Sequence, residues 1–192
     1  MMRVRIGVAV VLLTATGLAV PFGRASAIVG SAPQSVPQEV PAIFRPFYQG
    51  YSASEEQLKA ARAALPYDRV SLQRSGGMVV PSGAFTLTLS RSGEATLSTD
   101  AAGAFGRTGE WVGKVSIFDF GKISHLMSQI GFEHLGQRYA VNQTDLHTFT
   151  VSVATAHGAF AVADYGGAGP VELWSVEQSI KGIGSDIAWK KK

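Results

Sequence analysis

The chain has 192 residues, the size of one ordinary domain, and its 46% hydrophobic and 16% charged content allows a packed core and excludes general disorder. It contains no cysteine, which excludes disulfides, thiolate metal sites and thiol nucleophiles. The net charge of +3 comes from three arginines in residues 1–27, because the rest of the chain balances 14 basic against 14 acidic residues, so the charge does not predict binding to nucleic acid.

The first 27 residues have the pattern of an export signal. Arg3 and Arg5 precede Ile6–Val20, a run of 15 uncharged residues, and Ala25-Ser26-Ala27 is a small-x-small cleavage site. A permanent membrane anchor needs about 20 apolar residues, and this run is shorter. We therefore expect cleavage after Ala27, export to the periplasm or the medium, and no transmembrane segment after signal removal.

A proline-rich stretch, residues 28–50, follows and is predicted to be an extended tether. Its prolines recur every four or five residues, a spacing that excludes a helix. Residues 51–66 are predicted to hold a short helix, with Ser52 as its N-cap, Glu55 three residues later and Pro66 at its end.

From residue 67 onward, two periodicities alternate along the chain. Apolar residues at every second position predict strands near residues 70–73, 85–89, 95–97, 111–115, 149–153 and 160–165. Apolar residues at helical spacing predict two helices, with the stripes Phe120, Ile123, Met127, Ile130 and Leu173, Val176, Ile180, Ile183. Gly131 is placed to end the first helix, and Pro170 to occupy the first turn of the second.

Most of the predicted strands come in pairs joined by short turns, such as Arg91–Gly93 and His157-Gly158. We therefore expect an α+β fold over residues 67–189. It is predicted to be a single layered domain whose antiparallel sheet is built from hairpins, with two amphipathic helices packed on one face.

A series of short motifs runs through residues 67–189. In chain order they are Val70–Arg74, Pro81, Phe85–Leu89, Gly93, Gly131-Phe132, Tyr139, Thr144-Asp145, Tyr165 and Pro170. Their order resembles a family of exported bacterial domains of unknown function, the domain of unknown function 6438 type. That family carries a cysteine pair after its first strand, where this chain has Ser75–Pro81 without cysteine, so no metal, redox or disulfide role is implied. The resemblance implies a fold and an exported location, and it implies no activity.

The most polar cluster beside a predicted strand is Thr144–Thr148. Asp145 and His147 lie two positions apart, which on an extended chain turns both side chains the same way and suits an acid–base pair, with Arg74 as a further candidate. The interpretation that we favour is a turn in which Thr144 and Asp145 bind backbone amides before the strand begins.

Other candidate sites are weaker. The four histidines show no metal-ligand spacing, so neither a metal nor a cofactor is predicted. In the glycine loop before Pro170, Gly167 and Gly169 are candidates to bind an anion, although a flexible connection is the favoured interpretation. Tyr139 and Tyr165 are candidates to line a ligand groove, against the alternative of core packing.

These observations predict an exported, non-catalytic domain that binds or supports another envelope protein. Two alternatives stay open at this stage. One is an enzyme of unfamiliar type that uses Asp145, His147 and Arg74, and the other is an inhibitor that blocks a secreted enzyme with a face of its sheet. The sequence does not identify the envelope protein that would be the partner, and it excludes nucleic acid as a partner.

Overall fold

The computed structural model describes residues 54–77, 83–100 and 105–192. The expected signal peptide over residues 1–27, the cleavage site after Ala27 and the tether over residues 28–50 lie outside the described residues. In chain order the elements are α1 (Glu55–Ala63), β1 (Arg69–Ser75), β2 (Phe85–Ser90), β3 (Glu94–Thr99), β4 (Gly109–Lys114), α2 (Ile117–Gln129), η2 (Phe132–His134), β5 (Arg138–Ala140), β6 (Thr148–Thr155), β7 (Gly158–Tyr165), α3 (Val171–Asp186) and β8 (Lys190–Lys191). Helices and a single sheet share the described part of the chain, which confirms the α+β class.

The helix α1 begins at a reciprocal cap. The Ser54 hydroxyl accepts a hydrogen bond from the Gln57 amide at 3.2 Å, and the Gln57 side chain accepts one from the Ser54 amide at 2.8 Å. The N-cap is therefore Ser54, and the prediction of Ser52 is wrong. A start at Ser54 places Glu55 and Glu56 in the first turn, where the positive end of the helix dipole favours carboxylates.

One eight-stranded sheet forms the centre of the described fold, in the order β5-β7-β6-β1-β2-β3-β4-β8. The central strand β1 pairs antiparallel with β2 on one side and with β6 on the other. The edge strand β5 pairs parallel with β7, so the sheet is mixed. The predicted antiparallel pairing holds for the other strand pairs of the described sheet and is wrong for this one. The chain runs from β5 to β7 through β6, which is antiparallel to β7, so the β6–β7 hairpin returns the chain beside β5 in the parallel direction.

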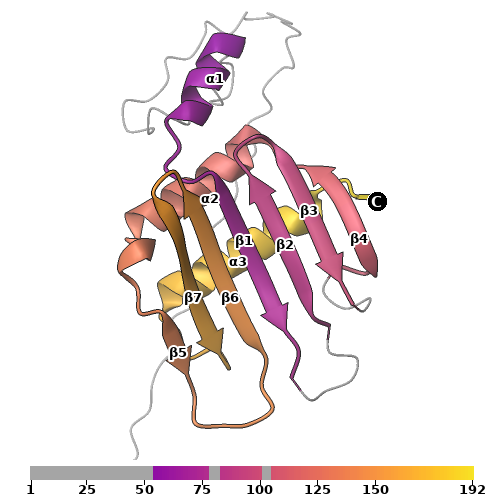
Figure 1. The fold of residues 1–192 in the computed structure, drawn as a ribbon, viewed down its shortest axis with the longest axis vertical. Helices are drawn as coiled ribbons and strands as arrows, with labels where there is room; N and C mark the ends of the chain where they lie inside the picture. The colour runs from indigo at the N-terminus through magenta and orange to yellow at the C-terminus, as the bar shows by residue number, and fades with distance from the viewer. Residues whose placement is uncertain (1–53, 78–82, 101–104) are drawn as a thin grey trace, which may run out of the picture. The chain divides into compact units, whose positions relative to one another are not determined.

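The helices α2 and α3 cover one face of the sheet. Figure 1 views the sheet from its other face, with both helices behind it. The fully buried side chains of the two helices include Phe120, Ile123, Met127, Leu173, Val176 and Ile180. Alternate strand residues meet them, among them Val70, Leu72, Leu87, Leu89, Leu97 and Val151. The core therefore forms where the apolar stripes of the two helices contact the strand residues that point toward them, which are every second residue of each strand.

The described C-terminal part of the chain differs from the prediction at Pro170 and has two features that were not predicted. Pro170 has an extended backbone, with ψ at 159°, so it is the N-cap of α3 and not part of its first turn. The helix continues through Gly184, which is buried against Leu87 and Phe105, to Asp186. The strand β8 pairs with β4, so the sheet extends beyond the expected limit at residue 189.

Candidate functional site

A polar row lies on the helix-covered face of the sheet, where β1, β6 and β7 carry Arg74, Phe149 and Asp164. The three residues are direct neighbours across the strands, since Phe149 is in register with both Arg74 and Asp164. From α3, the Lys181 ammonium nitrogen lies 5.7 Å from the centre of the Phe149 ring. Opposite charges therefore surround one aromatic ring beneath α3.

Two of the predicted site residues meet at this row, since Arg74 belongs to it and His147 packs against its Phe149. The Arg74 guanidinium donates a hydrogen bond to the Gly83 carbonyl at 2.9 Å, and the His147 ring meets Phe149 edge-on at 5.0 Å between ring centres. Partial burial, followed by the positive charge of Arg74, lowers the pKa of His147; Lys181 acts in the same direction, and Asp164 opposes it. The neutral imidazole is thus favoured.

Asp145, the third predicted catalytic residue, does not take part in this row. Its φ of 66° is left-handed, its side chain is exposed, and its carboxylate accepts a 3.3 Å hydrogen bond from the Thr144 hydroxyl. The amide of the next residue, Leu146, donates to the Tyr165 hydroxyl at 3.2 Å. The predicted pairing of Asp145 with His147 assumed an extended chain, and the left-handed residue removes that condition.

The glycine loop before α3 binds a carboxylate of the chain itself. The Gly169 amide donates to Asp164 Oδ1 at 3.0 Å. Gly166 and Gly167 have left-handed φ values of 70° and 75°, which turn the chain from β7 toward α3. Asp164 therefore occupies the place where the sequence suggested an external anion, and Gly169 has a structural partner.

Two buried carboxyl groups, Asp164 and Glu177, belong to this region and were not predicted. Each is 2% exposed, and Glu177 Oε1 has no hydrogen-bond partner among the described residues. Burial, followed by the charge of Asp164, raises the pKa of Glu177 from 4.5 to about 7, and Lys181 opposes the shift. A signal existed in the sequence, because Asp164 shares the inward phase of Val162, and Glu177 follows the stripe residue Leu173 by one helical turn.

The tyrosines proposed as groove residues have partners within the chain. The Tyr139 hydroxyl accepts from the Gly136 amide at 2.9 Å, and the Tyr165 hydroxyl accepts from the Leu146 amide. Trp174, on α3, is 55% exposed. The two hydroxyl groups thus hold the loops on either side of β5, which favours the packing interpretation.

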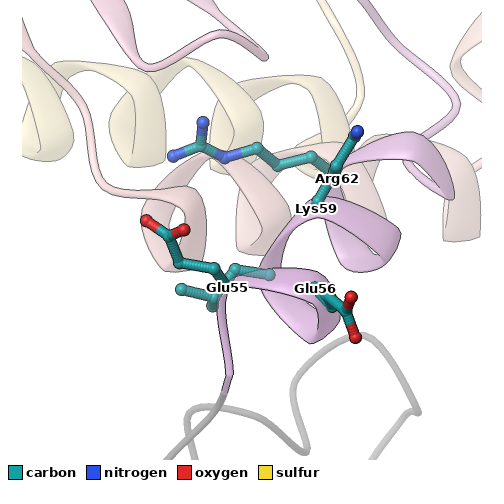
Figure 2. A pocket seen from close by; sticks show the side chains of 5 residues that line it. Glu55, Glu56, Lys59 and Arg62 are labelled. Carbon is teal, nitrogen blue, oxygen red and sulfur yellow. The ribbon is translucent and has the colours of Figure 1, made fainter.

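Two hollows in the described surface lie away from His147 and the buried carboxyl groups. One of about 360 Å³ is lined by Leu58 and by the four charged α1 side chains labelled in Figure 2. Its acidic residues lie in the first turn of α1 and Arg62 in the last, an arrangement explained by the helix dipole. Another, of about 280 Å³, lies at the ends of β1, β2 and β3 and includes Arg74. Neither hollow is lined by His147 or by the buried carboxyl groups.

The other face of the sheet carries short uncharged side chains across five neighbouring strands, and no helix of the described residues covers it (Figure 1). In phase with Ser71 this face presents Gln73, Thr86, Thr88, Ser90, Thr96, Ser98, Thr150, Ser152, Ala154, Ala161 and Ala163. The hydroxyls of Ser71 and Thr88 lie 3.1 Å apart and form a hydrogen bond between strands. Charged residues such as Arg69, Glu94 and Glu110 lie at the strand ends or on the outer strand β4. We call this surface the open face.

The described residues show neither a metal site nor a membrane-spanning helix. No group of three or more His, Asp or Glu side chains there is arranged to hold a metal ion. None of the helices described combines the length and the apolar character that crossing a membrane requires. A scan against protein-family models and searches of curated proteins and solved structures gave no match.

Proposed function

We propose that the chain is an exported, non-catalytic domain that binds another protein of the cell envelope through the open face. The observation that carries the proposal is the uncharged centre of that face, where hydroxyl and methyl groups cover five strands. Soluble proteins use charged side chains to prevent unwanted association of exposed sheet surfaces. A broad sheet face without such charges is therefore suited to contact with a partner.

The chemistry of the open face favours a protein partner. It has no cluster of cations for phosphate groups and no aromatic platform on which bases stack. Ser, Thr and Ala side chains lose little rotamer entropy when they are buried, so an extended contact orders few groups. In the described part of the chain α2 and α3 lie on the opposite face of the sheet (Figure 1), which leaves the open face available for this purpose.

The engagement of the polar row and of the nearby Glu177 within the chain counts against a catalytic role. Asp164 and Glu177 are buried, Asp164 accepts a hydrogen bond from the Gly169 amide, and Arg74 donates one to the Gly83 carbonyl. Export is supported by the pattern of residues 1–27, with cleavage after Ala27, and by the order of motifs that resembles the exported family.

Site-specific photo-cross-linking in the exporting cell tests the proposal. A photoreactive residue at Thr88, in the centre of the open face, is expected to give a cross-linked product of one discrete mass. The same residue at Ser179, exposed on α3, is the matched control and is expected to give none. Equal products at both positions, no product at Thr88, or a product of twice the mass of the chain would contradict the proposal.

Export is tested separately by N-terminal sequencing of the protein from the periplasm and the medium. The expected first residue is Ile28. Recovery of Met1 in a membrane fraction would contradict export by cleavage, without bearing on the open face.

A further inference from the structure

The carboxyl groups of Asp164 and Glu177 lie beneath α3, one on β7 and one on the helix itself. Gly169 packs so closely here that a Cβ atom on it would lie 3.0 Å from Asp164 Oδ2 and 2.8 Å from Leu173 Cδ2. Leu173 and Glu177 are one helical turn apart and therefore share a face of α3. The first two turns of α3 thus close directly over Asp164.

The two carboxyl groups have unequal surroundings. Asp164 accepts the Gly169 amide at 3.0 Å, whereas Glu177 Oε1 is buried without a partner among the described residues. An ionised Glu177 would place a second negative charge in the interior, with one oxygen unsatisfied, and such a charge is costly. A protonated Glu177 avoids this cost.

The charged and titratable groups around the pair come from several elements. Lys181 faces Glu177 from the next turn of α3, and Asp164 faces it from β7. His147, which lies just before β6, interacts electrostatically with Asp164, with Lys181 and with Arg74 of β1. Tyr139 is the β5 residue in register with Asp164. From α2 the buried side chains are uncharged, namely Ile117, Phe120, Ile123, Ser124 and Met127.

We propose that α3 is a pH-sensitive element, in which the buried Glu177 holds a proton beside Asp164 and the release of that proton to solvent loosens α3 from the sheet. The geometry that carries this inference is the pair of carboxyl groups, each 2% exposed, enclosed between β7 and α3. Lys181 lies one turn from Glu177 and compensates part of the charge, so release of the proton weakens the packing of α3 without requiring the whole molecule to unfold.

The direction of the pH dependence follows from proton linkage. The pKa of Glu177 rises from 4.5 to about 7 on folding, so the folded chain binds the proton more tightly than the unfolded chain does. The resulting stabilisation is complete below about pH 4.5 and is lost as the pH rises through about 7. The packing of α3 is therefore expected to be tightest in mildly acidic surroundings.

Hydrogen exchange of the folded chain at pH 5 and pH 8 tests this inference, with protection factors corrected for intrinsic exchange. In the parent, protection of the α3 amides relative to the β2 amides is expected to fall by about tenfold or more at the higher pH, since one pKa unit is a tenfold change in equilibrium. Glu177→Gln mimics the protonated acid and should abolish the fall. Glu172→Gln, at an exposed position in the first turn of α3, removes the same charge and should retain it.

Three results would overturn the inference. The first is that α3 protection in the parent is the same at pH 5 and pH 8. The second is that Glu177→Gln loses as much α3 protection at pH 8 as the parent does. The third is that protection of the β2 amides falls as much as that of the α3 amides, which would indicate global unfolding. If Glu177→Gln does not fold, Asp164→Asn is the second variant, since asparagine can still accept the Gly169 amide. Loss of the Asp164 charge should move the midpoint of the α3 transition to lower pH. An unchanged midpoint would contradict the effect of Asp164 on Glu177.

Discussion

At the scale of single residues, the backbone of Asp145 separates a structural role from a catalytic one. Its φ of 66° lies in the left-handed region, which aspartate, asparagine and glycine tolerate better than other residues. We expect Asp145→Ala to lower the free energy of unfolding by about 1 kcal/mol, the usual cost of a left-handed backbone for alanine. Asp145→Asn and Asp145→Gly should stay close to the parent. Denaturant unfolding measures all three, and a loss in Asp145→Asn as large as in Asp145→Ala would show that the carboxylate itself is needed.

His147 is expected to weaken the fold in acid. Partial burial and Arg74 lower its pKa, so the folded chain binds a proton less readily than the unfolded chain, whose imidazole titrates near 6.5. As the pH falls below 6.5, protonation favours the unfolded state and stability is lost.

The change His147→Gln removes this effect. Unfolding experiments between pH 7 and pH 5 should show the variant gaining stability relative to the parent as the pH falls. The difference in the free energy of unfolding between variant and parent is compared at each pH, because the opposite contribution of Glu177 is present in both proteins and cancels. His157→Gln, at an exposed turn position, is the matched control, and a similar gain there would remove the special role of His147.

At the scale of elements, the periodic segments were predicted, whereas the two buried carboxyl groups were missed although their positions in the periodic pattern signalled them. Alternation over Phe85–Leu89 predicted a strand, and β2 buries the expected residues; the stripe beginning at Phe120 likewise lies on the buried side of α2. The three residues of β5 are too few to show a period, so neither the strand nor its parallel pairing could be foreseen. Asp164 and Glu177 have the polarity of surface residues, and only the covering of β7 by α3 makes them interior groups.

Two glycines in α3 provide a test of how closely that helix packs. A Cβ atom on Gly182 would meet nothing within 4 Å, whereas one on Gly184 would lie 2.5 Å from Leu87 and 3.0 Å from the Phe105 ring. Gly182→Ala should raise the free energy of unfolding by about 0.5–1 kcal/mol through helix propensity. Gly184→Ala should lower it by about 1–3 kcal/mol through overpacking. Thermal or denaturant unfolding decides, and equal stabilisation by both changes would mean that the contact between α3 and β2 is looser than described.

At the scale of the whole molecule, the C-terminal segment ties α3 to the edge of the sheet opposite β5. Trp189 is buried, and its indole nitrogen donates to the Gly184 carbonyl at 2.9 Å. A Cβ atom on Gly113 of β4 would meet Ile187 first and would lie 3.1 Å from the Trp189 ring, so these two side chains fill the space that the glycine leaves. The segment then continues as β8 along β4. One aromatic ring thus contacts both layers of the fold near its last residue.

Replacement of Trp189 is therefore expected to affect global stability more than loss of the tail that follows it. Trp189→Ala should lower the free energy of unfolding by about 3–5 kcal/mol, the usual cost of removing a buried large aromatic side chain. Trp189→Phe retains a ring but leaves the Gly184 carbonyl without its donor, and should cost about 1–3 kcal/mol. Removal of Lys191 and Lys192, both exposed, should cost less than either, because it leaves the ring in place. Denaturant unfolding of the three variants should give this order, and a truncation as damaging as Trp189→Ala would show that the pairing of β8, not the indole, holds the end of α3 on the sheet.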